Sequence, residues 1–255
     1  MYQTCIFDLY GTLVDIHTEE DRKELWEKLA LFYGYYGAFY TGEELRDAYK
    51  RLTKEMSEGS VRLRTDSHEA YPELQIEQVF LRLFAERGID AGMELAVHAG
   101  QFFRVLSTDY IRLYEGTKEM LAAVKRAGKK IYLLSNAQRI FTEYEMKALD
   151  IFRFFDGIFI SSDHGCKKPD IRFFRALLEK YSILADTAVM VGNDGICDME
   201  GAKKAGLATL YIHSNLSPDE ENVEADHVQK QMDMREIAEI LTKDTADGGG
   251  FRIPV

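Results

Sequence analysis

Short apolar runs alternate with longer amphipathic segments over much of the chain. This alternation is typical of α/β proteins, in which helices connect the strands of a parallel sheet and cover its faces. Five runs are predicted to form strands, namely 4–9 (TCIFDL), 130–135 (KIYLLS), 157–161 (GIFIS), 188–192 (AVMVG) and 208–212 (ATLYI). The pattern therefore predicts a Rossmann-like parallel sheet.

Several segments between these runs carry apolar residues at helical spacing. They end in glycine or in basic residues, as helix C-termini often do. The helices predicted around the sheet are 117–128 (TKEMLAAVKRAG), 171–181 (IRFFRALLEKY) and 198–206 (DMEGAKKAG).

Residues 16–105 interrupt the alternation. Four amphipathic segments follow one another there without a convincing strand, at 19–37, 42–59, 72–88 and 93–106. The pattern predicts an all-helical insertion after the first strand, placed as a lid. We therefore expect two domains, an α/β core from residues 1–15 and 106–255 and a helical cap domain from residues 16–105.

Composition and charge narrow the class of protein. The chain has 255 residues, of which 46% are hydrophobic and 29% charged, a balance that supports a buried core and argues against disorder. The formal net charge of −11 disfavours nucleic acid as a partner. Cys5, Cys166 and Cys197 show no metal-type spacing, and the N-terminus lacks the stages of a signal peptide. No apolar run reaches the roughly 18 residues of a membrane span. We expect a reduced, cytoplasmic protein with no membrane partner.

Polar residues recur where the predicted strands end. Asp8, Ser135 with Asn136, Ser161 with Ser162, and Asn193 with Asp194 each follow directly on the apolar run of one strand. Ligand sites of open α/β sheets lie outside the carboxyl ends of the strands. The sequence therefore predicts that these polar groups share one site.

Four stretches in a fixed order carry a resemblance to a known family. They are FDLYGTLVD (7–15), LLSNAQ (133–138), CKKPDIRFF (166–174) and VGNDGICDMEGAKKAG (191–206). Together they resemble the motifs of the haloacid dehalogenase superfamily, most of whose members are phosphatases. The helical insertion lies where one class of these enzymes carries its cap.

The resemblance implies a role for several residues. Asp8 would be the nucleophile, because a carboxylate can attack phosphorus or carbon and form a covalent ester. Lys168 would be a fixed cation for Asp8 and for the transferred group. Ser135 would donate a hydrogen bond to an oxygen of that transferred group. Thr12 would form a hydrogen bond within the loop that carries Asp8, which we call the nucleophile loop. Thr12, Ser135, Asn136 and Lys168 are the residues expected to bind the substrate.

A metal site is also implied. Mg²⁺ takes oxygen ligands, usually one or two carboxylates with waters and substrate oxygens. Its ligands here would be Asp8, the backbone carbonyl of Tyr10, Asp194 and Asp198. For Asp198 the alternative is a purely structural N-cap, because it starts a predicted helix.

Tyr10 departs from the phosphatase pattern. Most phosphatases of the superfamily have a second aspartate two residues after the nucleophile, which protonates the leaving alcohol. Tyr10 occupies that leaving-group position, and tyrosine, with a reference pKa of about 10, is a poorly matched acid. The 2-haloacid dehalogenases of the superfamily carry a tyrosine there and a Ser-Asn pair like Ser135 and Asn136, and halide leaves without a proton.

Two other positions differ from the family patterns. Phe174 stands where the dehalogenases have a tyrosine. The last motif keeps the glycine and two acids of a phosphatase, but Asn193 occupies the place that many members give to aspartate, and Asp194 follows it.

The sequence therefore favours an Mg²⁺-dependent phosphatase that acts on a small phosphorylated metabolite through an aspartyl-phosphate at Asp8. A metal-free 2-haloacid dehalogenase and a low-turnover phosphate-binding regulatory protein stay open as alternatives. The identity of the substrate and the oligomeric state are not predicted.

Overall fold

The structure is a computed structural model that describes residues 2–62, 71–219 and 222–243. Its centre is a six-stranded parallel sheet with the strand order β5-β4-β1-β6-β7-β8. The strands are β1 (Thr4–Phe7), β4 (Lys130–Ser135), β5 (Gly157–Ile160), β6 (Ala188–Gly192), β7 (Ala208–Ile212) and β8 (His227–Gln229). All five predicted strands are present, and the short edge strand β8 is additional.

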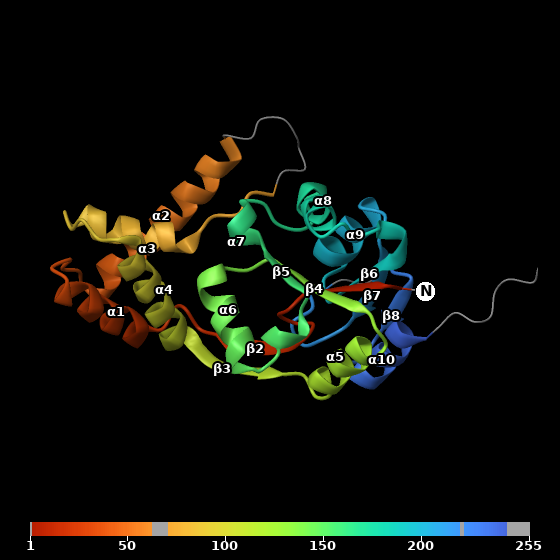
Figure 1. Ribbon diagram of the computed structural model, residues 1–255. Coiled ribbons are helices and arrows are strands. Elements are labelled where there is room, and N and C mark those ends of the chain that lie inside the picture. The colour runs from red at the N-terminus through yellow and green to blue at the C-terminus, as the bar shows by residue number, and fades with distance from the viewer. Residues whose placement is uncertain (1, 63–70, 220–221, 244–255) are drawn as a thin grey trace, which may run out of the picture.

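Helices cover both faces of this sheet (Figure 1). On one face Cys5 and Phe7 of β1 pack with the apolar sides of α5 (Thr117–Arg126) and α10 (Met234–Thr242). On the other face Ile6 packs with α8 (Ile171–Lys180) and α9 (Gly201–Lys204). Successive residues of a strand point to opposite faces, so a short run without polar residues fits a sheet that is buried on both sides. The predicted Rossmann-like core is confirmed.

The remaining elements of this part of the chain are short connections around the sheet. They are α6 (Arg139–Ala148), α7 (Ser161–His164), the 3₁₀ turns η1 (Phe152–Phe154) and η2 (Ala185–Thr187), and the π-helical turn η3 (Gly195–Glu200).

The predicted helical insertion is also present. Its helices are α1 (Lys23–Tyr35), α2 (Gly42–Arg62), α3 (Ile76–Glu86) and α4 (Met93–Ser107). They gather to one side of the sheet (Figure 1) and share an apolar core of their own, which includes Trp26, Tyr33, Phe80, Phe84 and Phe103. None of the helices that the structure describes is long and apolar enough to cross a membrane.

A two-stranded antiparallel ribbon joins the insertion to the sheet. Its strands are β2 (Val14–Thr18) and β3 (Thr108–Leu113), with Ile16 opposite Ile111. The expectation that no strand lies within residues 16–105 is wrong for β2, which crosses the boundary predicted at residue 16. Its pairing partner is about ninety residues away in the sequence, so neither strand stood out by itself. The division into two domains stays a proposal.

Candidate active site

A small cavity of about 180 Å³ lies at the carboxyl ends of the strands. Residues at or just after the ends of β1, β4, β6 and β7 line it, together with the segment before α8. The lining residues are Asp8, Tyr10, Ser135, Asn136, Lys168, Asn193, Asp194, Cys197, Asp198, Leu216 and Pro218. Three of the four predicted strand-end groups thus meet in one place. Ser161 and Ser162, the fourth group, do not line the cavity; their hydroxyls accept hydrogen bonds from the backbone at Ala137 and Arg139.

Lys168 is the centre of the site. Its side chain is 2% exposed, and its ammonium donates to Asp8 Oδ1 at 2.7 Å, to Asp198 Oδ1 at 2.6 Å and to the carbonyl of Leu134 at 2.9 Å. These three acceptors use all three N–H donors of the ammonium. Burial alone would lower the pKa of Lys168, but the carboxylates of Asp198 and Asp8 outweigh it and raise the pKa. Lys168 is therefore a fixed cation and not an exposed loop residue.

Asn136 holds the backbone of Lys168 in place. Its side-chain oxygen accepts from the Lys168 N–H at 2.8 Å, and its side-chain nitrogen donates to the Lys168 carbonyl at 3.0 Å. The side chain that was predicted to bind substrate thus positions the lysine.

Ser135 presents an unused polar atom. The residue is 1% exposed, and its buried hydroxyl has no hydrogen-bond partner among the described residues. Leaving a buried hydroxyl unpaired costs about 1–3 kcal/mol, so such groups usually have a partner when the protein works. Because Ser135 lines the cavity, a ligand oxygen there would satisfy it.

Thr12 belongs to the loop after β1 that carries Asp8. It is fully buried, and its hydroxyl lies 3.5 Å from Asp8 Oδ2 and 3.3 Å from Asn193 Oδ1. A Cβ atom on Gly11, which has φ +84°, would come within 2.3 Å of the Asn193 side chain. Close packing of the two loops therefore requires a glycine there.

The two acids of the last motif have different surroundings. Asp194 caps η3, where one of its oxygens accepts from the N–H groups of Ile196 at 3.0 Å and Cys197 at 2.6 Å. Asp198 lies inside η3 and is 1% exposed. Its Oδ2 accepts from the backbone N–H groups of Asn193 and Asp194, both at 3.1 Å, while its Oδ1 faces Lys168. The N-cap considered for Asp198 is therefore formed by Asp194.

Comparison with known proteins agrees with this geometry. The model of the haloacid dehalogenase-like hydrolase family matches residues 2–206, which is most of the chain. The chain belongs to the haloacid dehalogenase-like hydrolases. The membership inferred from the four motifs is confirmed.

Individual relatives of this hydrolase match shorter parts of the chain than the family model does. It is 32% identical over 120 residues to a glyceraldehyde 3-phosphate phosphatase of Methanothermobacter thermautotrophicus, covering 47% of this chain and 51% of the relative. It is 29% identical over 160 residues to a phosphoserine phosphatase of Thermus thermophilus, covering 60% and 64%. The chain thus spans about half to two thirds of the length of these relatives.

A solved 2-haloacid dehalogenase from Pseudomonas syringae shares the fold. Its TM-score is 0.60 at 19% identity, over 94% of this chain and 98% of the other. At this identity the likeness concerns the fold alone.

Tyr10 does not direct its hydroxyl to the nucleophile. The hydroxyl donates to Glu145 Oε2 of α6 at 2.5 Å and lies 3.1 Å from the hydroxyl of Thr142. Glu145 in turn forms an ion pair with Arg104 of α4 at 2.6 Å. Burial and the Glu145 carboxylate raise the pKa of Tyr10 well above its usual value. This chain of contacts, which ties the nucleophile loop to the insertion, was not predicted from the sequence.

A second connection between insertion and core holds the segment that carries Lys168. Residues 71–74, which we call the strap, run beside residues 165–167, where the Lys167 N–H donates to the Tyr71 carbonyl at 2.9 Å and the Glu73 N–H donates to the Gly165 carbonyl at 3.2 Å. The Glu73 carboxylate also accepts from the Ser161 hydroxyl at 2.9 Å and from the Gln138 side chain at 3.3 Å. The insertion therefore supports the lysine from outside the core.

The carboxylate oxygens that line the cavity are of the kind that Mg²⁺ binds. Among the residues that the structure describes, no group of three or more His, Cys, Asp and Glu side chains is arranged to hold a metal. Mg²⁺ does not need such a group, because it usually binds through one or two carboxylates with waters and substrate phosphate. Asp8, Asp194 and Asp198 all line the cavity. Both oxygens of Asp198 already have donors, whereas the backbone donors at Asp194 use only one of its two oxygens. The geometry therefore favours Asp194 over Asp198 beside Asp8.

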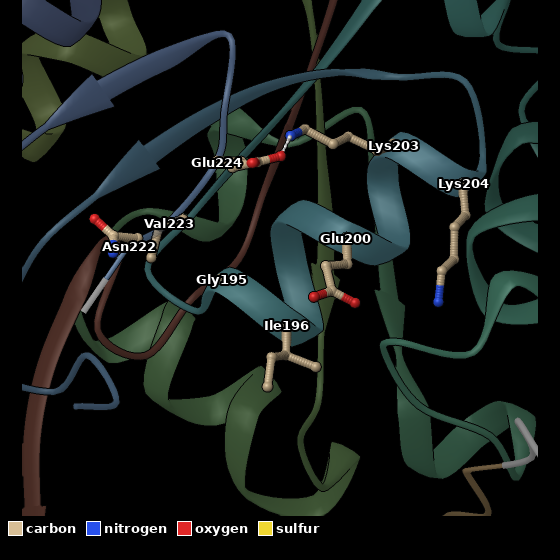
Figure 2. Close-up of a pocket in the computed structure, with 8 residues that line it drawn as sticks. All are labelled: Gly195, Ile196, Glu200, Lys203, Lys204, Asn222, Val223 and Glu224. Atoms are coloured by element: carbon tan, nitrogen blue, oxygen red, sulfur yellow. Dashed lines mark ion pairs between the residues drawn. The ribbon is translucent and has the colours of Figure 1, made fainter. Parts of the chain in front are cut away.

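A larger cavity of about 610 Å³ lies next to the π-helical turn η3 (Figure 2). It is lined by Gly195, Ile196, Glu200, Lys203, Lys204, Asn222, Val223 and Glu224. Lys203 pairs there with the exposed Glu224 at 3.8 Å. The two cavities share no lining residue, so the lysines of this larger cavity are not part of the site around Asp8.

Proposed function

We propose that this hydrolase is a phosphatase that acts on a small phosphorylated metabolite through an aspartyl-phosphate at Asp8. One observation carries the proposal. The Lys168 ammonium bridges Asp8 and Asp198 at the carboxyl edge of the parallel sheet. The buried hydroxyl of Ser135, which has no hydrogen-bond partner among the described residues, lines the same cavity. A cavity lined by a cation, a carboxylate and a hydroxyl that can still donate suits an anionic group with several oxygens.

The reaction would use these residues in two steps. Asp8 attacks the phosphorus, a bond forms between its carboxylate oxygen and phosphorus, and the bond to the leaving oxygen breaks. Water then attacks the same phosphorus, which releases phosphate and restores the Asp8 carboxylate. Lys168 holds Asp8 in place in both steps, and Ser135 donates to an oxygen of the transferred group. A magnesium ion beside Asp8 and Asp194 would neutralise negative charge on the phosphoryl group when bound.

The leaving oxygen needs a proton unless it is a stable anion. The Tyr10 proton is already donated to Glu145, so the described arrangement does not present it to the leaving group. We therefore expect aryl and acyl phosphates, whose leaving groups need little protonation, to react faster than alkyl phosphates.

The names of the relatives support the phosphatase proposal. Glyceraldehyde 3-phosphate phosphatase and phosphoserine phosphatase both remove phosphate from small molecules. Because the two relatives are named for different substrates, their names do not indicate which substrate this protein uses. The cytoplasmic location stays a prediction.

The test measures release of phosphate from an aryl phosphate with Mg²⁺ and with a chelator. We expect turnover only with Mg²⁺, none in Asp8→Asn, and a mass increase of one phosphoryl group on Asp8 after rapid quenching. Asp186→Asn, an exposed aspartate outside the cavity, is the matched control and should keep full activity. A well-folded Asp8→Asn protein with substantial activity would refute the covalent mechanism.

Tyr10 supports a second candidate, the metal-free hydrolysis of 2-haloacids, because halide leaves without a proton. The same assay with 2-chloropropionate and no metal separates the two reactions. Chloride release without Mg²⁺ and no phosphate release would favour this candidate. Binding of phosphate without turnover of either compound would favour the regulatory protein.

A further inference from the structure

The charges that line the small cavity restrict the substrate. Its lining contains three carboxylates, Asp8, Asp194 and Asp198, and one cation, Lys168. Lys168 is already paired with two of those carboxylates. The phosphate group of the substrate would interact with Lys168, the one cation among the described lining residues. A second anionic group on the substrate would therefore meet no unpaired cation among those residues.

Other cations around the site do not line this cavity, and Lys167, the neighbour of Lys168 in the sequence, is one of them. Arg104 pairs with Glu145 and lines a different cavity, between α4, β3 and α6. Lys203 and Lys204 line the larger cavity beside η3. None of them lines the cavity that contains Asp8.

The apolar part of the lining comes from the loop after β7. Leu216, which is 37% exposed, and Pro218 form an apolar wall beside the polar groups. No described residue of α1–α4 lines this cavity. The wall is therefore the surface that the carbon atoms next to the phosphate would touch.

Hydrogen bonds hold this wall in position. The Asn215 side chain donates to the buried Asp15 at 2.9 Å and accepts from the Tyr114 hydroxyl at 2.7 Å. Within the loop the Ser214 N–H donates to the Ser217 hydroxyl at 3.0 Å. The loop is thus anchored to β2, and these hydrogen bonds hold the backbone on either side of Leu216 in place.

We propose that the organic part of the substrate is small and uncharged, that it lies against Leu216 and Pro218, and that Leu216 determines this specificity. This inference rests on the proposed phosphatase function and deepens it. It excludes phosphate esters that carry a carboxylate next to the ester. The phosphate would use Lys168 and the magnesium ion that Asp8 and Asp194 would hold, so the carboxylate would lie near these two acids without a further cation among the described lining residues.

A pair of isosteric substrates tests the charge directly. Phosphoglycolate and glycolamide phosphate have nearly the same shape, but only the first carries a carboxylate. We expect kcat/KM to be about tenfold or more higher for the amide. Equal values, or a preference for phosphoglycolate, would overturn the inference while the phosphatase function stands. If neither compound nor an aryl phosphate is hydrolysed, the proposed function itself fails.

Two variants test the role of Leu216. Leu216→Arg supplies the missing cation and should lower the preference for the amide at least about fivefold, mainly through a lower KM for phosphoglycolate. Leu184→Arg adds the same charge at an exposed leucine outside the cavity and should leave the preference unchanged. An unchanged preference in Leu216→Arg would show that Leu216 does not determine specificity.

Inhibition of the parent protein by two small phosphonates tests the same inference without a variant. Phosphonoacetamide should inhibit at about a tenfold lower concentration than phosphonoacetate, for the same reason of charge. Equal inhibition by the two compounds would contradict the inference even if Leu216→Arg did not fold.

Discussion

Replacing Tyr10 by phenylalanine should lower stability and leave the chemistry almost unchanged. The substitution removes the hydroxyl and keeps the ring. Because that hydroxyl donates to Glu145 and not to the site, we expect kcat/KM for aryl and alkyl phosphates to stay within about threefold of the parent, whereas loss of a true general acid would cost about 10²–10⁴-fold.

The loss of stability follows from the partners of the hydroxyl. Glu145 is 8% exposed, and a hydrogen bond to a charged group contributes about 1.5–3 kcal/mol. Glu145 keeps its ion pair with Arg104 after the substitution, which favours the lower part of that range, about 2 kcal/mol. In a chain of this size that corresponds to a decrease of roughly 4–8 °C in Tm.

The assay combines thermal unfolding with steady-state kinetics. Circular dichroism follows the whole chain, and the single tryptophan, Trp26 of α1, follows the helical insertion. Tyr40→Phe is the matched control, because it removes a tyrosine hydroxyl that donates to the Leu83 carbonyl within the insertion, away from the site. It should lower Tm less than Tyr10→Phe and leave kcat/KM unchanged.

One result would refute this reasoning. If Tyr10→Phe unfolds like the parent but loses more than about a hundredfold in kcat/KM, the hydroxyl leaves Glu145 during turnover and serves the leaving group. The dependence on the leaving group should then be steeper in the variant than in the parent.

Three further predictions concern charged groups of the site and its surroundings. Asp194→Asn should weaken Mg²⁺ binding, measured by calorimetry, more than Asp198→Asn does, whereas Asp198→Asn should cost about 3 kcal/mol or more in unfolding free energy, because it removes one partner of a buried ion pair. Tyr10→Asp should raise the hydrolysis of alkyl phosphates selectively, because a carboxyl group there can protonate the departing oxygen; an equal change for aryl phosphates would contradict this. Burial would raise the pKa of Asp15, but hydrogen bonds from Asn215 and Arg112 outweigh it and lower the pKa, so the ionised carboxylate stabilises the folded state above the unfolded pKa of about 3.9. The difference in Tm between the parent and Asp15→Asn should therefore be constant from about pH 5 to 8 and shrink as the pH falls below about 4.

The sheet and the main site residues could be predicted because each depends on local sequence. Apolar runs such as Ala188–Gly192 specify a strand buried on both faces, and the polar residue that follows each run marks the end of the strand. Parallel strands bring those ends to one edge, so Asp8, Ser135 and Asp194 meet without any knowledge of tertiary contacts.

The features that were missed depend on residues far apart in the chain. Glu145 lies 135 residues after Tyr10, and nothing in the helix that carries it connects the two. The ribbon of β2 and β3 needs two segments that are separated by the whole insertion. Asp198 looked like the start of a helix, but the turn begins earlier and is capped by Asp194. The sequence pattern does not distinguish a π-helical turn from the start of an α-helix.

The strap, residues 71–74, limits whether the helical insertion can be deleted or exchanged without effect on the core. Insertions in a sheet protein are often treated as modules that can be deleted or exchanged, since they enter and leave the core at one point. Here a core with residues 16–105 replaced by a short linker would lose the backbone partners of Gly165 and Lys167 and the carboxylate that accepts from Ser161. A cap from another hydrolase would need an equivalent of residues 71–74, because in this protein part of the support for the lysine belongs to the exchangeable piece.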